Sequence, residues 1–113
     1  MTTIYHNPRC SKSRQCLSIL EEKKEDLQII KYLENPLTED ELADIITLLG
    51  VEPIDLVRKN EAIWKQEFKG KQLTNEEVVK AMIDHPKLIE RPIVIKNNKA
   101  IIGRPPEKVI DIL

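Results

Sequence analysis

Residues 2–20 read TTIYHNPRCSKSRQCLSIL, and they contain the strand and helix from which the rest of the fold is predicted. The segment Thr2–His6 is β-branched and aromatic, which predicts a short strand that Asn7-Pro8 ends. Neither glycine nor proline occurs in Ser11–Lys24, and small or apolar side chains recur there three and four apart, which predicts an amphipathic helix. The segment Leu27–Tyr32 predicts a second strand. Strand, helix and strand within about thirty residues are typical of a parallel βαβ unit.

The rest of the chain predicts helices first and then a hairpin. Thr38 and Thr74 each stand three residues before a glutamate, which is the spacing of a capping box at a helix start. Two apolar segments flank Asn97-Asn98-Lys99, and this pattern predicts a β-hairpin. A final helix is expected to begin at Pro105-Pro106. Its apolar side chains are expected to pack back on the sheet: Val109, Ile110 and Leu113.

Length and composition indicate one globular domain. The chain has 113 residues, with 18 Lys and Arg against 19 Asp and Glu, 41% hydrophobic residues and a net charge of -1. A nucleic-acid-binding protein normally carries a basic excess, and no apolar run approaches the roughly 20 residues of a transmembrane helix. We therefore expect a cytoplasmic monomer that binds neither nucleic acid nor membrane. The element order predicts an α/β fold over residues 1–113, with a four-stranded mixed sheet and a helical insertion at about 38–86.

Cys10 stands between the predicted first strand and the predicted first helix. Backbone N–H groups are unpaired at a helix start and the helix dipole is positive there, so a thiolate is stabilised relative to the thiol. Arg9, Lys12 and Arg14 add positive charge within four residues. The alternative is a buried structural cysteine, the commoner fate of a free cysteine. The polar and cationic neighbours favour a reactive thiol.

Cys16, by contrast, falls on the apolar face of the same helix, four residues before Leu20. A helix rotates by about 240° over six residues, so the two sulfurs should not meet, and we favour core packing of Cys16 over a resolving role. A phosphatase loop of the C-x5-R type would need arginine where Cys16 stands. The chain has no C-x-x-C pair, so redox work by Cys10 would need an external thiol. The histidines and cysteines lack the spacing of metal ligands, so no metal is expected.

Four separated segments resemble, in the same order, segments of the glutaredoxin-coupled arsenate reductases, and the resemblance covers essentially the whole chain. The segments are His6–Arg14, Leu56–Lys59, Glu90–Val94 and Ile102–Pro105. The resemblance implies a thioredoxin-like fold with a helical insertion, and an enzyme that reduces arsenate to arsenite. It also implies glutathione as a co-substrate, glutaredoxin as a partner, and no bound cofactor.

The resemblance further implies roles for single residues. Cys10 looks like the nucleophile that forms a covalent adduct with arsenic(V). The arginines that hold the oxyanion and the reduced intermediate correspond to Arg58, Arg91 and Arg104. The residues that bind substrate or tune the thiolate correspond to His6, Ser13 and Arg14. Arginine suits such a site because its planar guanidinium group binds two oxygens at once.

The same comparison implies a cis peptide bond between Arg91 and Pro92, facing the cysteine. Arg91 and Arg104 lie at opposite ends of the predicted hairpin, so its turn is expected to bring them together. Arg58 would have to reach the same place by tertiary folding.

Two other hypotheses stay open. The first is a related glutathione-dependent thiol oxidoreductase with another substrate, whose first motif would look much the same. The second is a non-catalytic redox regulator similar to the Spx-like proteins, which bind RNA polymerase. Those regulators often use a C-x-x-C switch, and Ser13 occupies its second position here, which disfavours that hypothesis.

Overall fold

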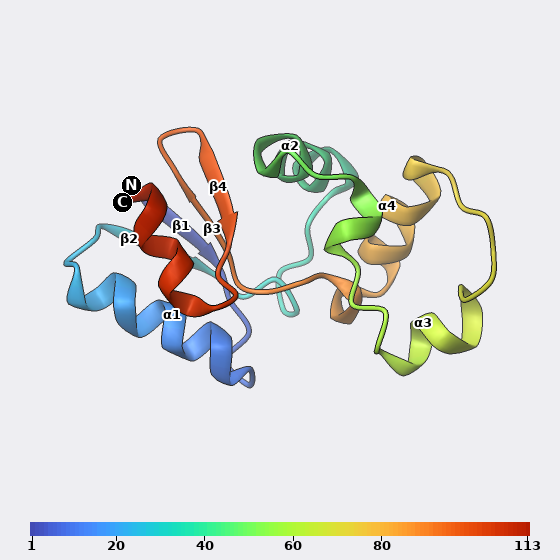
Figure 1. The fold of residues 1–113 in the computed structure, drawn as a ribbon, viewed down its shortest axis with the longest axis horizontal. Helices are drawn as coiled ribbons and strands as arrows, with labels where there is room; N and C mark the ends of the chain where they lie inside the picture. Colours follow the sequence, from blue (N-terminus) through green and yellow to red (C-terminus); the bar gives the residue numbers. More distant parts are fainter. The chain divides into compact units, whose positions relative to one another are not determined.

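The computed structural model describes residues 1–113, which divide into two compact units (Figure 1). The first, here called the sheet unit, comprises Met1–Asn35 and Arg91–Leu113. The second, here called the helical unit, comprises Pro36–Glu90 and includes the whole segment predicted as a helical insertion. Each unit is described by itself below.

The sheet unit is built on four strands (Figure 1). They are β1 (Thr2–Tyr5), β2 (Leu27–Ile30), β3 (Ile93–Lys96) and β4 (Lys99–Ile102). Their order is β2-β1-β3-β4: β1 runs parallel to β2 and antiparallel to β3, and β3 and β4 are antiparallel. The predicted α/β fold with a four-stranded mixed sheet is therefore confirmed.

The hairpin between β3 and β4 turns at Asn97 and Asn98, whose φ angles are 51° and 61°. Two successive residues with positive φ are typical of a type I′ turn, and asparagine tolerates that conformation better than other non-glycine residues. Lys99 pairs with Lys96 and belongs to β4 rather than to the turn. The hairpin prediction is confirmed, with a loop one residue shorter than the segment that predicted it.

Two helices, α1 (Ser11–Glu22) and η3 (Pro106–Ile112), pack on this sheet. With β1 and β3 they enclose a core of side chains that are 0% exposed: Ile4, Cys16, Leu20, Val94 and Val109. The prediction for the last helix is wrong in part, because Ile110 and Leu113 are exposed and Ile112 packs against the core instead. The reason is that η3 is a 3₁₀ helix, in which residues three apart share a face, so Ile112 follows Val109.

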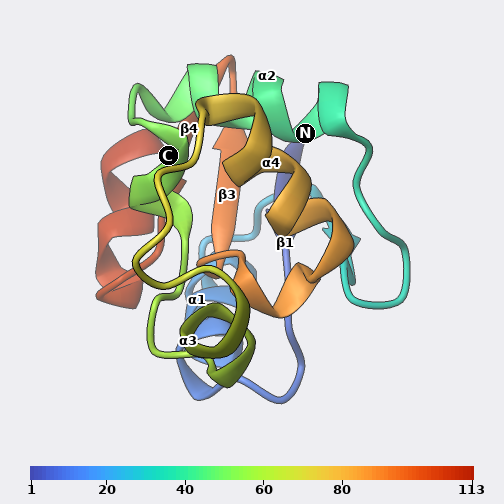
Figure 2. The ribbon, with the colours of Figure 1, turned by 90° about the vertical axis from the view of Figure 1, so that its right-hand side faces the viewer.

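The helical unit contains three α-helices and two short 3₁₀ helices. They are α2 (Glu39–Leu49), η1 (Pro53–Leu56), α3 (Ala62–Glu67), α4 (Asn75–Asp84) and η2 (Pro86–Leu88). Helices α2 and α4 pack against each other (Figure 2). Thr38 and Thr74 both form complete capping boxes, as predicted. None of the helices combines the length and the apolar composition that a membrane span requires.

An aromatic group joins α3 to the end of α4. The rings of Trp64 and Phe68 stack with centroids 5.3 Å apart, and the ring of His85 meets Phe68 edge-on at 6.0 Å. His85 Nε2 also lies 3.7 Å from a carboxylate oxygen of Glu67. His85 therefore contributes to packing at the end of α4.

Candidate active site

Cys10 is the N-cap residue of α1, at the end of the short loop that follows β1. Its backbone has the extended conformation of an N-cap, with φ -94° and ψ 122°, but its side chain makes no capping hydrogen bond. The first turn of α1 also has no acidic residue. A thiolate or an oxyanion at this point would meet the positive end of the helix without a competing carboxylate from that turn.

Asn7 fixes the loop that carries Cys10. Its carbonyl oxygen accepts the Cys10 N–H at 3.0 Å, and its side-chain Oδ1 accepts the Arg9 N–H, also at 3.0 Å. Its own N–H donates to Ser13 Oγ at 3.1 Å. Sequence patterns did not indicate a role for Asn7, because an Asn-Pro pair predicts a turn but not the hydrogen bonds that the turn makes.

His6 and Ser13 form a buried pair beside this loop. His6 Nδ1 lies 2.6 Å from Ser13 Oγ, and both side chains are buried. Burial lowers the pKa of His6 from 6.5, and the positive charges of Lys31 and Arg14 lower it further. The ring is therefore neutral at neutral pH. The pair ties the end of β1 to the first turn of α1, and a direct hydrogen bond from either residue to Cys10 stays a prediction.

Arg104 meets Cys10 within the sheet unit. Arg104 Nη2 lies 3.6 Å from Cys10 Sγ, and Arg104 Nε donates a hydrogen bond of 2.7 Å to the carbonyl oxygen of Arg91. Gly103 N–H also donates to the Pro92 carbonyl at 2.9 Å, so the hairpin does bring its two ends together as predicted. The Arg91–Pro92 bond is cis, as the resemblance implied, and the Arg104–Pro105 bond is cis as well.

Arg58 lies in the helical unit, where two carboxylates hold its guanidinium group. Arg58 Nη1 lies 3.3 Å from Glu61 Oε2, and Nε lies 3.6 Å from Glu90 Oε1. The Arg58 N–H donates to the Leu88 carbonyl at 2.7 Å, next to an antiparallel bridge between Val57 and Ile89. Arg58 is thus fixed to the segment that leads directly into Arg91. Its part in oxyanion binding stays a prediction.

Arg14 uses its guanidinium group within its own loop. Arg14 Nη1 donates a hydrogen bond of 2.9 Å to the carbonyl oxygen of Pro8. It therefore braces the turn between β1 and α1, and its role as a substrate ligand stays a prediction.

Cys16 is 0% exposed in the core of the sheet unit, and both cysteines are free thiols. Burial raises the pKa of Cys16 to about 11, so it is a thiol at neutral pH. The prediction that Cys16 packs in the core is confirmed. A thiol that resolves chemistry at Cys10 would then come from outside the chain. No group of three or more His, Cys, Asp or Glu side chains in residues 1–113 is arranged to hold a metal ion.

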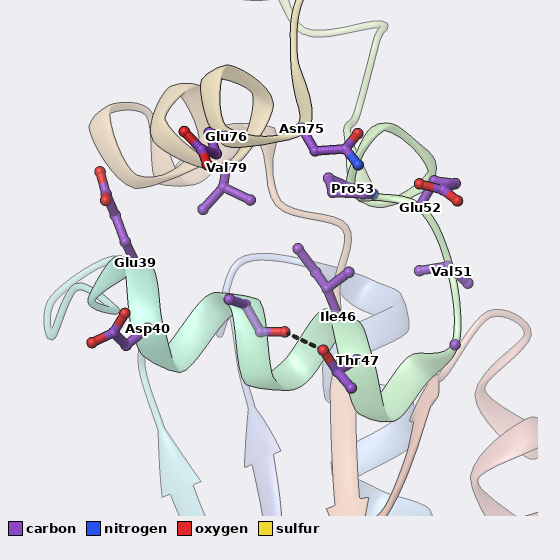
Figure 3. A pocket seen from close by; sticks show the side chains of 12 residues that line it. Glu39, Asp40, Ile46, Thr47, Val51, Glu52, Pro53, Asn75, Glu76 and Val79 are labelled. Atoms are coloured by element: carbon purple, nitrogen blue, oxygen red, sulfur yellow. Dashed lines mark hydrogen bonds between the residues drawn. The ribbon is translucent and has the colours of Figure 1, made fainter.

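The structure has a cavity in each unit. A cavity of about 590 Å³ lies in the helical unit, over Ile46 and Val79 (Figure 3). Glu39, Asp40 and Glu76 surround it, so it is unsuited to an oxyanion. A second cavity, of about 440 Å³, lies in the sheet unit and is lined in part by the loop that carries Cys10.

A mixed sheet in this strand order, a cysteine at the start of the helix after β1 and a cis-proline directly before β3 define a thioredoxin-like protein. The family model for ArsC matches residues 5–112, and the chain belongs to the ArsC family. The resemblance seen in the sequence is therefore confirmed at the level of the family.

Curated relatives and a solved structure are similar to the chain over almost its whole length. The arsenate reductase of Haemophilus influenzae is 43% identical over 112 residues, which cover 97% of each chain. The uncharacterized protein YfgD of Escherichia coli K12 is 45% identical, over 97% of this chain and 94% of its own. A solved structure, the arsenate reductase from Vibrio cholerae, is 46% identical with a TM-score of 0.96, covering 99% of this chain and 97% of that one.

Proposed function

We propose that this protein is an arsenate reductase that converts arsenate to arsenite through a covalent adduct on Cys10. The observation that carries the proposal is the position of the Arg104 guanidinium group, 3.6 Å from Cys10 Sγ at a helix start without a side-chain cap. Membership of the ArsC family and the named arsenate reductases among its relatives support the choice of substrate.

In the first step the Cys10 thiolate attacks arsenic(V). A sulfur–arsenic bond forms, and an arsenic-bound hydroxyl leaves as water with one added proton, so arsenic keeps its oxidation state. The thiolate and the anion repel each other, and the Arg104 guanidinium offsets this repulsion where the two meet. The Arg91 carbonyl accepts a hydrogen bond from Arg104 Nε, which orients Nη2 toward the reacting sulfur. Arg58 and the Arg91 side chain would bind the remaining oxygens.

The reducing equivalents come from external thiols, because Cys16 is buried in the core. Glutathione condenses with the arsenic adduct and releases a second water. Glutaredoxin then attacks the glutathione sulfur, a mixed disulfide forms, and the electron pair of the broken sulfur–arsenic bond reduces arsenic to the trivalent state. Hydrolysis of the Cys10–arsenic bond releases arsenite and the free thiol. This chemistry uses no bound cofactor, and it suits the cytoplasm, where thiols are kept reduced.

The test is arsenite formation by purified protein with glutathione, glutaredoxin and a system that regenerates reduced glutathione. Cys10→Ser should abolish turnover, and Cys16→Ala should keep most of it. Arg104→Lys keeps the charge but loses the planar guanidinium, and we expect turnover to fall about 100-fold. No arsenite above background from the wild-type protein would overturn the proposal.

The same assay separates the alternatives. Turnover of glutathionylated substrates without arsenite formation would indicate a thiol oxidoreductase with another substrate. Capture of RNA polymerase subunits without turnover of any oxyanion would indicate a redox regulator.

A further inference from the structure

The cavity of about 440 Å³ in the sheet unit lies where two loops leave neighbouring parallel strands. The His6 N–H donates to the Ile30 carbonyl at 2.8 Å, which holds the end of β1 beside the end of β2. After β2 the chain turns tightly, because the Glu34 and Asn35 N–H groups both donate to the Lys31 carbonyl, at 3.0 and 2.9 Å. A crevice outside the carboxyl ends of parallel strands is a common place for a ligand, and its volume falls within the roughly 300–1,000 Å³ of small-molecule sites.

The lining of this crevice carries a defined set of charges. Arg9 and Lys31 supply two cations and Glu34 one anion, all exposed, while Pro8 and Leu33 supply apolar surface. Lys31 also acts on His6, whose pKa its charge lowers after the larger effect of burial. An organic ligand with two carboxylates and one ammonium group would match the three charges one to one.

The loop that lines one side of the crevice leads directly into the nucleophile. Arg9 directly precedes Cys10, and the Asn7 carbonyl, in the same wall, accepts the Cys10 N–H at 3.0 Å. An extended tripeptide spans roughly 10 Å, which is several times the one-residue step from Arg9, in the lining, to Cys10. The resident second cysteine has no such access, since Cys16 is 0% exposed.

We propose that this crevice binds the thiol co-substrate, a low-mass peptide thiol with two carboxylates and one ammonium group such as glutathione. The proposal rests on the proposed function. Arg9 and Lys31 bind the carboxylates, and Glu34 binds the ammonium group. The bound thiol condenses with the arsenic on Cys10: its sulfur bonds to arsenic, its proton leaves with an arsenic-bound hydroxyl as water, and no oxidation state changes in this step.

Binding is tested first with S-methylglutathione, whose blocked sulfur prevents reaction, by calorimetry and by amide chemical shifts in the absence of arsenate. We expect saturable binding with shifts concentrated in residues 6–9 and 31–34. Lys31→Glu should weaken binding about 2- to 5-fold, since exposed charge pairs are worth up to about 1 kcal/mol. Lys23→Glu is the matched control: it makes the same charge change in an exposed lysine at the end of α1, which does not line the crevice.

Steady-state kinetics with two thiols tests the role of the charges. Lys31→Glu should raise the KM for glutathione by a similar factor, and by more than it changes the KM for arsenate or the rate of adduct formation on Cys10. With 2-mercaptoethanol, a neutral thiol, Lys31→Glu and the wild type should differ much less than with glutathione. A merely structural effect of the substitution would alter arsenate kinetics and both thiols together.

Two results would overturn the site: no saturable binding to the wild-type protein, or equal weakening by Lys23→Glu and Lys31→Glu. The binding measurement needs no arsenate, so its failure is separable from failure of the proposed function. Binding of S-methylglutathione without any arsenate turnover would keep the crevice as a thiol-peptide site and overturn the reductase proposal. Arsenate turnover without such binding would overturn the crevice alone.

Discussion

Helices α2 and α4 of the helical unit begin differently from helix α1 of the sheet unit. In the helical unit, Thr38 Oγ1 accepts the Glu41 N–H at 3.1 Å and Thr74 Oγ1 accepts the Glu77 N–H at 3.2 Å, and each glutamate bonds back to its threonine N–H. Both helices also carry acidic residues in the first turn. In the sheet unit, α1 begins at Cys10 with neither a side-chain cap nor an acidic residue.

A capped helix start stabilises its helix, whereas the uncapped start of α1 is free to bind an external anion. In α2 and α4 the capping threonine and glutamate satisfy N–H groups at the helix start, and the capping hydrogen bonds of Thr74 lower the pKa of Glu77. Helix α1 forgoes a contribution of about 1 kcal/mol and leaves its positive end open to an external anion. Its other face packs in the core through Cys16 and Leu20, both 0% exposed, which keeps the helix in place.

The largest expected effect comes from giving α1 the cap that it lacks. Cys10→Ser nearly keeps the shape of the side chain, and the N-cap backbone conformation allows its hydroxyl to accept an N–H from the first turn. We expect complete loss of arsenate turnover, because the nucleophile is gone. The free energy of unfolding should exceed that of Cys10→Ala by about 1 kcal/mol. Arsenite assays and urea unfolding measure the two effects.

Cys10→Ala is the matched control, since it also removes the nucleophile but cannot cap. Equal unfolding free energies for the serine and alanine variants would show that a side-chain cap at position 10 does not stabilise α1. That result would contradict the contrast between α1 and the capped helices α2 and α4.

The next effect concerns glycines in the two units. A Cβ atom added to Gly103 would lie 2.9 Å from Pro92 Cγ and 3.0 Å from Cys16 Sγ, so Gly103→Ala should lower the free energy of unfolding by about 1–3 kcal/mol. Because the core would have to shift beneath Arg104, turnover should fall as well. The contact predicts partial rescue by Cys16→Ala in the double variant.

Gly70→Ala in the helical unit is the control. A Cβ there would meet nothing within 4 Å, but the φ angle of 81° is strained for alanine, at a cost of about 1–2 kcal/mol. Its effect should be on stability alone, with no rescue by Cys16→Ala. Identical behaviour of the two glycine variants would contradict the close packing at Gly103.

Local signals predicted most of the fold. The two capping boxes, the Asn97-Asn98 turn and the strand before Pro8 depend on side chains within a few residues of one another, and the structure has each of them. The last helix was predicted less well, because periodicity alone does not distinguish a 3₁₀ helix from an α-helix over so few residues. The prediction therefore placed Ile110 and Leu113 against the core, whereas in the structure both are exposed and Ile112 packs there.

The sequence predicted the candidate site only where local structure, such as the hairpin, brings residues together. The hairpin predicted that Arg91 and Arg104 would meet, but not that Arg104 Nε would bond to the Arg91 carbonyl while Nη2 lies 3.6 Å from Cys10 Sγ. The three hydrogen bonds of Asn7 depend on the exact path of the loop, which no periodicity encodes. The crevice at Lys31 is formed by the loops that follow β1 and β2. The sequence does not predict it, because it depends on the pairing of these two strands in the folded sheet.

A smaller effect is expected from removing the caps of the helical unit. Thr38→Ala and Thr74→Ala should each lower the free energy of unfolding by about 1 kcal/mol, because the N–H groups of Glu41 and Glu77 lose their acceptors. Arsenate turnover below the unfolding transition should not change. Serine at either position restores the hydroxyl and should restore most of the stability. Loss of turnover in the folded alanine variants would show that the helical unit is coupled to the chemistry through its helix starts.

The smallest expected effect is the pH dependence that His6 gives to the sheet unit. Burial, with help from Lys31 and Arg14, lowers the pKa of His6 from its usual 6.5, so the unfolded chain takes up the proton at a higher pH than the folded one. The contribution of His6 to stability is therefore complete above about pH 6.5 and is lost as the pH falls through the lowered pKa of the folded state. His6→Gln removes the titrating group and keeps a polar side chain near Ser13. Urea unfolding of both proteins at a series of pH values should show a smaller loss of stability on acidification in the variant, and parallel curves would mean that the His6–Ser13 pair titrates alike in the folded and unfolded chains.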